Sequence, residues 1–157
     1  MSTSGAFSWS QVVPPDGIAA GIVRAGVDRV ELDEFQRTVD VAGAEFLERT
    51  FTQEELAFCA GRVNRLATRF AAKEAVAKVL GTGFRDLGWQ EVEVLTFPHG
   101  EPSVVLHDRA RHRAERLGMR SIGVSLTHTT VAAEAFVVAL CMRGDLEQRV
   151  REEIRCG

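Results

Sequence analysis

The sequence predicts an α+β fold: a single compact domain with a mixed or antiparallel sheet and packed helices. Its 157 residues are 45% hydrophobic and 26% charged, which is typical of one globular domain. Strand-like and helix-like segments come in runs rather than in strict alternation, and this grouping is typical of α+β proteins. No internal repeat is visible in the chain.

The domain itself is expected to cover residues 21–142, with an extension at each end. Residues 1–20 are small and polar, and Pro14-Pro15-Asp16-Gly17 breaks regular structure within them. Residues 143–157 are rich in charge and predict either one exposed helix or a disordered tail. We therefore interpret 1–20 as an N-terminal extension and 143–157 as a C-terminal tail.

The first predicted strand runs from Ile22 to Val30 and leads directly into a helix. Apolar residues keep helical spacing after this strand, and they are Leu32, Phe35 and Val39. Gly43 then interrupts the pattern, because glycine is unfavourable inside a helix. We expect the regular helix to stop or break there.

Capping signals and composition predict two further helices. Thr52 and Glu55 lie three residues apart and form a capping box, which opens a helix that continues to about Gly61. A longer helix is expected from about residue 64 to residue 80. Its many alanines let another backbone or a ligand come close, and the glycine turn Gly81-Thr82-Gly83 ends it.

The second half of the chain predicts two hairpins with a helix between them. Apolar, β-branched runs predict strands at 92–97, 103–107, 122–126 and 134–142. The turn between the first two strands contains Gly100 and Pro102, which are typical of tight turns. The helix between the hairpins is expected over 108–117, because its apolar residues keep helical spacing and Gly118 follows.

Composition argues against several functional classes. The net charge is −3 and no basic cluster with interleaved aromatic residues is present, so we expect no nucleic-acid partner. No apolar run approaches 18 residues, so we expect no membrane span and no signal peptide. The odd number of widely spaced cysteines predicts reduced thiols in a cytoplasmic protein; they are Cys59, Cys141 and Cys156.

The alanine-rich helix carries the most informative charges. Glu74 and Lys78 lie four residues apart, which places a carboxylate and an ammonium on one side of the helix. Arg69 and Lys73 add cationic charge further back. A carboxylate that holds a hard cation, flanked by cations that meet phosphate oxygens, is the charge layout of a magnesium–diphosphate site. The alternative is an exposed helix with an ordinary Glu–Lys pair.

Taken together and in order, six segments resemble the holo-acyl-carrier-protein synthase family, the small phosphopantetheinyl transferases. The similarity runs from about residue 21 to residue 140. Its segments are Gly26-Val27-Asp28, Phe51 to Leu56, the Lys73-Glu74 helix with Gly81-Thr82-Gly83, a strand from Trp89 to Leu95, Gly100-Glu101-Pro102, and Val124 to Thr129. Each segment is a weak signal by itself, whereas all six in the family order are a strong one. The chain is too short for the doubled form of the larger phosphopantetheinyl transferases.

The resemblance implies a fold, an activity and an assembly. The expected reaction is the Mg²⁺-dependent transfer of 4′-phosphopantetheine from coenzyme A to a serine of an apo acyl or peptidyl carrier protein, with release of adenosine 3′,5′-bisphosphate. Asp28 and Glu74 match the family's metal ligands, and Lys78 matches the lysine placed against the diphosphate. We predict an electrostatic role for Lys78, because a lysine beside two carboxylates should stay protonated. The family also implies a ring-shaped homotrimer with active sites between subunits.

The resemblance assigns coenzyme binding to a second set of residues: Arg69, Lys78, Gly81, Gly83, Gly100, Pro102, His128 and Thr129. In this assignment the arginine and the glycine turn meet phosphate groups, and the hairpin residues line the adenine pocket. Each residue also has a structural alternative. Asp28 is equally typical of a turn or helix cap, and a lone histidine such as His128 is more often structural than functional.

Two positions depart from the family. Glu34 stands where the family usually has an arginine that faces the acidic helix of the carrier protein, and Glu101 stands where lysine is usual. We therefore expect a carrier that is less acidic at the contact, or docking through Arg29 and Arg37; the alternative is that the contact residues lie elsewhere. A second functional hypothesis is a non-catalytic coenzyme A-binding or scaffold protein, against which the retained Asp28, Glu74, Lys78 and His128 argue.

Overall fold

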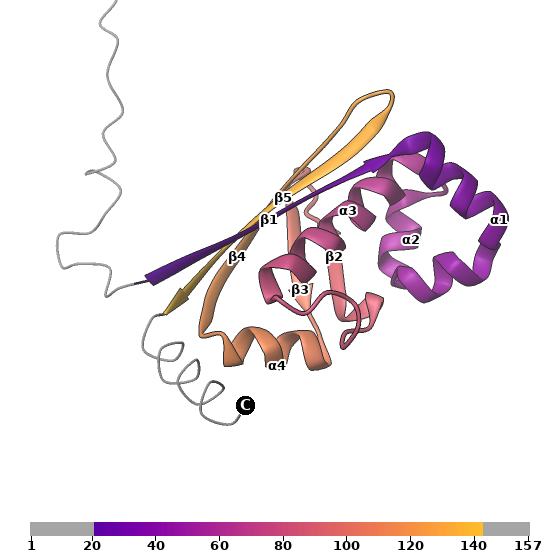
Figure 1. The fold of residues 1–157 in the computed structure, drawn as a ribbon. Helices are drawn as coiled ribbons and strands as arrows, with labels where there is room; N and C mark the ends of the chain where they lie inside the picture. Colours follow the sequence, from indigo (N-terminus) through magenta and orange to yellow (C-terminus); the bar gives the residue numbers. More distant parts are fainter. Residues whose placement is uncertain (1–20, 143–157) are drawn as a thin grey trace, which may run out of the picture.

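Helix α3 (Val63–Leu80) organises the fold, because other elements pack on several of its sides (Figure 1). The computed structural model describes residues 21–142, so the two extensions predicted at 1–20 and 143–157 lie outside the described residues. Most of α3 is buried, which excludes the alternative of an exposed surface helix. The predicted α+β class is confirmed, since helices pack against strands that pair only in antiparallel fashion within the described range.

One face of α3 packs against a three-stranded antiparallel sheet. Its strands are β1 (Gly21–Glu31), β4 (Met119–His128) and β5 (Ala132–Met142), in the order β1-β5-β4. The predicted first strand and the predicted last hairpin are thus confirmed, with strands somewhat longer than expected. The register places Asp28 of β1 opposite Ala135 of β5. Asp28 therefore lies in the interior of the strand and not at a turn.

Two helices follow β1, and Figure 1 shows them together beyond the end of that strand. Helix α1 (Leu32–Thr50) is kinked at Gly43, whose φ of 61° and ψ of −152° are not helical, as the sequence predicted. Helix α2 (Gln53–Cys59) begins with the predicted capping box. The Glu55 N–H donates to the Thr52 hydroxyl at 3.3 Å, and the Thr52 N–H donates to the Glu55 carboxylate at 2.9 Å.

The predicted strand from Trp89 to Leu95 begins later than expected. Residues Trp89–Glu91 form a 3-10 turn, η2, and β2 covers Val92–Thr96. The Trp89 ring stacks between Phe84 and Phe70, with ring centroids 3.8 and 4.8 Å away. This aromatic packing holds the turn in place of a strand. Strand β3 (Pro102–Leu106) completes the predicted hairpin, and helix α4 (Asp108–Arg116) follows it.

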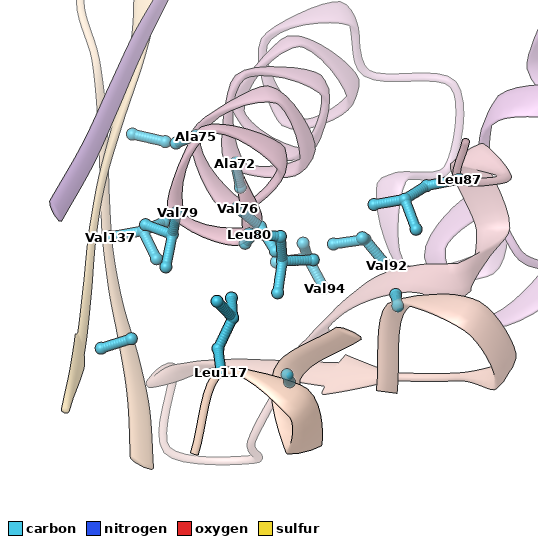
Figure 2. Close-up of a cluster of buried hydrophobic side chains, with 14 of the residues drawn as sticks. Ala72, Ala75, Val76, Val79, Leu80, Leu87, Val92, Val94, Leu117 and Val137 are labelled. Carbon is cyan, nitrogen blue, oxygen red and sulfur yellow. The ribbon is translucent and has the colours of Figure 1, made fainter. Parts of the chain in front are cut away.

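The main core lies between the sheet and the β2–β3 hairpin, with α3 in the middle. Figure 2 shows Val79 of α3 beside Val137 of β5, and Leu80 of α3 near Val94 of β2 and Leu117 at the end of α4. A second cluster joins α1, α2 and the first turns of α3, around Phe35, Phe51 and Leu66. The two clusters fix both ends of α3, so its side chains hold defined positions relative to β1.

The outer face of the three-stranded sheet is apolar and exposed. Val27 is 60% exposed and lies opposite Phe136, which is 49% exposed; Val23 is 65% exposed, and Val138 is exposed on β5. Contiguous exposed apolar surface of this kind is typical of a protein–protein contact. We call these four residues the outer sheet patch.

Within residues 21–142, none of the helices combines the length and the hydrophobicity that crossing a bilayer requires. Cys59 and Cys141 are both buried and unpaired. The third cysteine, Cys156, lies outside the described residues.

Candidate active site

Strand β1 and helix α3 touch at Gly26, and this contact builds the site. A Cβ atom at Gly26 would lie 2.2 Å from the carbonyl oxygen of Ala75, far closer than real Cβ atoms approach. Only glycine allows the strand to lie this near the helix backbone. Alternate residues of a strand share a face, so Asp28 points toward the same helix as Gly26. The contact thus brings Asp28 to the part of α3 that carries Glu74 and Lys78.

Asp28 and Lys78 meet directly. The Lys78 ammonium donates to the Asp28 carboxylate at 2.6 Å and to the carbonyl oxygen of Val27 at 2.8 Å. Between residues 71 and 80 of α3, Glu74 and Lys78 are the two that are not buried. Lys78 pairs with Asp28 on the neighbouring strand, and the described contacts include no ion pair between Glu74 and Lys78. The alternative of an ordinary intrahelical Glu–Lys pair is therefore wrong.

The charges of Asp28 and Lys78 also act on the Glu74 carboxyl. Partial burial raises the pKa of the Glu74 carboxyl, the nearby charge of Asp28 raises it further, and Lys78 opposes both effects. Two carboxylates that repel each other beside one ammonium make a site where an additional cation is favoured. A pocket of ≈400 Å³ opens at this pair, and its lining includes Asp28, Glu31, Glu34, Phe35, Phe70 and Glu74.

A larger cleft of ≈1190 Å³ lies elsewhere, between the ends of α1 and α2, the η2 turn and the start of α4. It includes none of the site residues that the sequence predicted. Glu93 is one of its lining residues; its carboxylate accepts a hydrogen bond from the Thr52 hydroxyl at 2.6 Å and lies 2.9 Å from the His107 ring. These bonds connect α2 to the β2–β3 hairpin, and we assign them a structural role.

Arg69 lies apart from the Asp28–Lys78 pair. It is 3% exposed, and its guanidinium donates to the Thr96 hydroxyl at 2.7 Å at the end of β2. Burial lowers the pKa of Arg69. No carboxylate forms an ion pair with Arg69 among residues 21–142, and its Nε atom is buried without a hydrogen-bond partner. The guanidinium also donates to the carbonyl oxygen of Arg65 at 3.3 Å and lies over the Phe58 ring, 4.3 Å from its centroid, so structural contacts explain its burial within one chain.

The predicted hairpin residues belong to the same group as Arg69. Pro102 lies opposite Thr96 in the β2–β3 register, so Arg69, Thr96 and Pro102 gather at one end of the hairpin. Gly100 is in the turn, with a φ of 96° that favours glycine. Glu101 at this turn lies 3.1 Å from His99. The chain therefore brings these predicted coenzyme residues together, although in a different place from Asp28.

His128 and Thr129 form a third group, at the turn between β4 and β5. The His128 ring lies 3.0 Å from the side-chain amide of Asn64, near the start of α3. The Thr129 hydroxyl accepts hydrogen bonds from the N–H groups of Val131 and Ala132. These contacts hold the turn, so a structural role explains Thr129 within one chain.

The glycine turn differs from the sequence expectation in one respect. We expected its N–H groups to face a phosphate, but Gly81 donates its N–H to the carbonyls of Ala77 and Lys78, and Thr82 donates to Ala77. Gly81 is the left-handed cap of α3, with a φ of 75°, which is why these donors turn back to the helix.

Lys73 also differs from the expectation, which gave it a role near phosphate. Its side chain is 0% exposed and pairs with the buried Glu55 carboxylate at 2.8 Å. The ammonium also donates to the carbonyl oxygens of Trp89 and Val92. Lys73 is therefore a structural residue that ties α3 to α2 and β2. The sequence shows the capping role of Glu55 but gives no signal for its pairing with Lys73, 18 positions later.

Comparison with known proteins defines the class to which this fold and site belong. Residues 24–141 match the family model described as the 4′-phosphopantetheinyl transferase superfamily, and the chain belongs to that superfamily. Within it, a holo-[acyl-carrier-protein] synthase of Solibacter usitatus is 41% identical over 121 residues, which are 74% of this chain and 97% of the relative. The chain is thus a member of the holo-[acyl-carrier-protein] synthase family, as the sequence segments indicated.

Solved structures agree with this placement. The holo-[acyl-carrier-protein] synthase of Neisseria meningitidis superposes with a TM-score of 0.67 at 34% identity, and covers 74% of this chain and 96% of its own. The enzyme of Helicobacter pylori, solved in complex with coenzyme A, superposes with a TM-score of 0.67 at 26% identity, and covers 73% and 98% of the two chains. The predicted phosphopantetheinyl transferase fold is confirmed.

Proposed function

We propose that this protein is a holo-[acyl-carrier-protein] synthase, which transfers 4′-phosphopantetheine from coenzyme A to a serine of an apo carrier protein. Membership of the family supports this activity. The structural observation that supports it is the contact of β1 with α3 at Gly26. This contact sets Asp28 beside Lys78 and lets Asp28 and Glu74 line one pocket. Phosphoryl transfer needs positioning and charge stabilisation from the protein and little covalent chemistry, so a cluster of these charged side chains can promote it.

The reaction forms one bond and breaks another. The serine oxygen bonds to the phosphorus that carries pantetheine, the bond from that phosphorus to the bridging oxygen breaks, and adenosine 3′,5′-bisphosphate leaves with the electron pair. As the new bond forms, the serine proton passes to a carboxylate of the site or to a water molecule. Lys78 supports this step as a cation: its ammonium donates to two acceptors and keeps a further N–H for a phosphate oxygen. It orients and neutralises the diphosphate and does not remove the proton.

Asp28 and Glu74 would hold the magnesium ion. Magnesium prefers oxygen ligands and is usually bound by one or two carboxylates, with substrate oxygens and water completing its octahedron. Among the described residues, no group of three or more histidine, cysteine or acidic side chains is suited to a metal. A pair of carboxylates is nevertheless enough for magnesium, which usually takes one or two from the protein. When bound, the ion would supply positive charge against the diphosphate. Burial and, after it, the charge of Asp28 raise the pKa of the Glu74 carboxyl, and a cation bound by both carboxylates would offset these effects.

A homotrimer would complete the site. The predicted coenzyme residues form separate groups within one chain, with Arg69 and Pro102 at the hairpin and His128 at the β4–β5 turn. A neighbouring subunit that brings one group to another's Asp28 would assemble them. The outer sheet patch offers an apolar surface for this contact. Light scattering should give the mass of three chains, and a monomer would contradict this assembly.

The carrier protein and the compartment are further parts of the proposal. Glu34 lines the pocket beside Asp28 and Glu74, so a carrier that delivers its serine there meets negative charge. A carrier that is less acidic at this contact would bind better. We place the enzyme in the cytoplasm, which is consistent with the unpaired Cys59 and Cys141.

The activity is tested by incubating the protein with coenzyme A, Mg²⁺ and a panel of apo carrier proteins, and by measuring the mass of each carrier. A mass gain of one phosphopantetheine on the carrier serine is expected, and chelation of Mg²⁺ should abolish it. Coenzyme binding without a mass gain on any carrier would instead support a non-catalytic binding protein. Consumption of coenzyme A without a carrier product would indicate a different phosphate-handling enzyme.

A further inference from the structure

Asn64, in the first turn of α3, contacts the ring of His128, and the orientation of its amide follows from a second contact. The Arg65 N–H donates to the Asn64 Oδ1 atom at 3.0 Å. A flipped amide would set its amino group against this N–H, and two donors would then face each other. The amino nitrogen Nδ2 is therefore the atom that lies 3.0 Å from His128 Nε2.

The position of this amino group fixes the tautomer of the His128 ring. An amide NH₂ group has two N–H donors and no acceptor, so the Nε2 atom that it meets must accept and carries no proton. A neutral imidazole has one proton, which then lies on the other ring nitrogen. Asn64 thus holds His128 with its proton on Nδ1, whereas a ring without this contact is free to carry the proton on either nitrogen.

The Nδ1–H group of His128 is open to a ligand. The residue is exposed beside the turn between β4 and β5, and within residues 21–142 its ring makes no hydrogen bond besides the contact with Asn64. An N–H donor suits a phosphate oxygen, which is an acceptor. The other neutral tautomer would present a lone pair at the same place, and a lone pair repels a phosphate oxygen.

The structural alternative is that Asn64 only serves the first turn of α3. N–H groups in that turn lack helical partners, and Arg62, the residue before the helix, offers them no side-chain hydrogen bond. The Asn64 Oδ1 atom supplies one acceptor. An aspartate at this position would supply the same acceptor and add a favourable charge at the helix N-terminus. The two roles therefore predict different results for Asn64→Asp.

We propose that Asn64 is a positioning residue that holds His128 in the Nδ1–H tautomer, so that the ring binds a phosphate oxygen of the coenzyme as a donor. This inference rests on the proposed function, in which His128 belongs to the coenzyme site. It also gives His128 no part in removing the serine proton. Nε2 is occupied by the amide and Nδ1 already carries a proton, so neither nitrogen is free to act as a base.

The first measurement locates the proton by nitrogen NMR of the full-length protein labelled with ¹⁵N-histidine, at about pH 8.5, where an imidazole is neutral. Protonated and unprotonated ring nitrogens resonate far apart, and a His128→Gln sample identifies the His128 signals among the four histidines. In wild type the proton should be on Nδ1. In Asn64→Asp the carboxylate only accepts, so the proton should move to Nε2. A wild-type ring with its proton on Nε2 would overturn the inference.

The second measurement gives the consequence for coenzyme A at the same pH, in the transfer assay and by calorimetry. Asn64→Asp should raise KM and Kd about tenfold, the loss expected for one hydrogen bond to a charged group, and leave kcat within about twofold. Gln53→Glu is the matched control, since it exchanges an amide for a carboxylate at an exposed position in the first turn of α2. If the proton moves while KM and Kd stay at wild-type values, Asn64 only serves the helix and the inference is wrong.

Two further variants keep the test decisive. In a His128→Gln background, Asn64→Asp should cause no further loss of affinity; an equal loss there would assign the effect to the added charge and overturn the inference. Asn64→Ala removes the contact without adding charge, so it should shift part of the proton to Nε2 and weaken coenzyme binding even where the aspartate variant folds poorly.

NMR and calorimetry also separate the two proposals, because both give a result even if no carrier is modified. Absence of transfer, with coenzyme binding that still depends on Asn64, would refute the proposed function alone.

Discussion

Lys73 and Lys78 lie five residues apart on one helix and have opposite surroundings. Lys73 is fully buried against Glu55, whereas the side chain of Lys78 is 51% exposed and meets Asp28. Burial lowers the pKa of Lys73, and the Glu55 carboxylate only partly compensates. The Lys73 ammonium contacts Glu55 and donates to two backbone carbonyls, whereas the Lys78 ammonium keeps one N–H for a ligand.

The difference shows how one charged segment can serve two purposes. The sequence predicts a helix with several cations suited to phosphate, and all of them look alike at this level. The position of α2 and β2 against one side of α3 converts Lys73 into a structural residue. The position of β1 against the other side leaves Lys78 partly exposed and paired with Asp28. The side of the helix, and not the residue type, decides which lysine can meet a substrate.

The largest expected effect comes from removing the buried ion pair between Lys73 and Glu55. Lys73→Met should lower the free energy of unfolding by about 3–5 kcal/mol, because it leaves Glu55 buried and charged without its partner. Urea or thermal unfolding measures this loss. The matched variant Lys78→Met should change stability by less than about 1 kcal/mol, since the Asp28–Lys78 pair is partly exposed. Equal losses in the two variants would remove the distinction drawn here.

The site around Asp28 and Lys78 is tested by Glu74→Ala, which should abolish transfer and leave the fold intact. Loss of a metal ligand should reduce the rate at least tenfold, or about 1.4 kcal/mol in activation free energy. The transfer assay measures the rate, and circular dichroism checks the fold. Glu45→Ala, an exposed change on α1 outside the pocket, is the control. Activity above about a tenth of wild type would exclude Glu74 from the metal site.

The raised pKa of Glu74 also predicts how the melting temperature depends on pH and on magnesium. Its carboxyl pKa is raised in the folded chain, so its ionised form destabilises the metal-free fold above that pKa, and this cost disappears as pH falls through it. Glu74→Gln should therefore match or exceed the wild-type melting temperature in chelator at neutral pH. Magnesium should raise the melting temperature of wild type at neutral pH but not that of the variant, and less at acid pH.

The close contact between β1 and α3 at Gly26 is tested by Gly26→Ala. The added methyl would meet the Ala75 carbonyl oxygen, so β1 must move away from α3 at a cost of about 1–3 kcal/mol. The displacement should also separate Asp28 from Lys78 and lower the transfer rate. Gly123→Ala on β4, where nothing lies within 4 Å of a new Cβ, is the control. A fully active and stable Gly26→Ala protein would contradict this account of the site.

Local signals in the sequence predicted most of the fold. The capping box at Thr52, the break at Gly43 and the glycine end of α3 each depend on neighbours within one turn, and all three are present. The η2 turn at Trp89 was missed because it depends on rings from Phe70 and Phe84, which no local pattern brings together. Packing over long sequence separations overrode the strand propensity there.

The candidate site was predictable in its residues but not in its arrangement. Asp28, Glu74 and Lys78 were found through family resemblance and spacing; Asp28 and Glu74 line one pocket, and Lys78 pairs with Asp28. The contact of Asn64 with His128 gave no sequence signal, because the two lie 64 positions apart in the chain. The burial of Lys73 was equally invisible, since it requires α2 to be in place.

The smallest expected effect concerns Glu34, in the pocket that Asp28 and Glu74 line. Glu34 lines this pocket and carries negative charge toward an approaching carrier. Glu34→Arg should therefore speed the reaction with acidic carriers by a few-fold, and more at low salt, because the change acts on association between charged surfaces. Glu45→Arg makes the same charge reversal on α1 away from the pocket, so it separates a local contact from the change in net charge. An unchanged rate for Glu34→Arg at low salt, across carriers of different charge, would place the docking surface elsewhere.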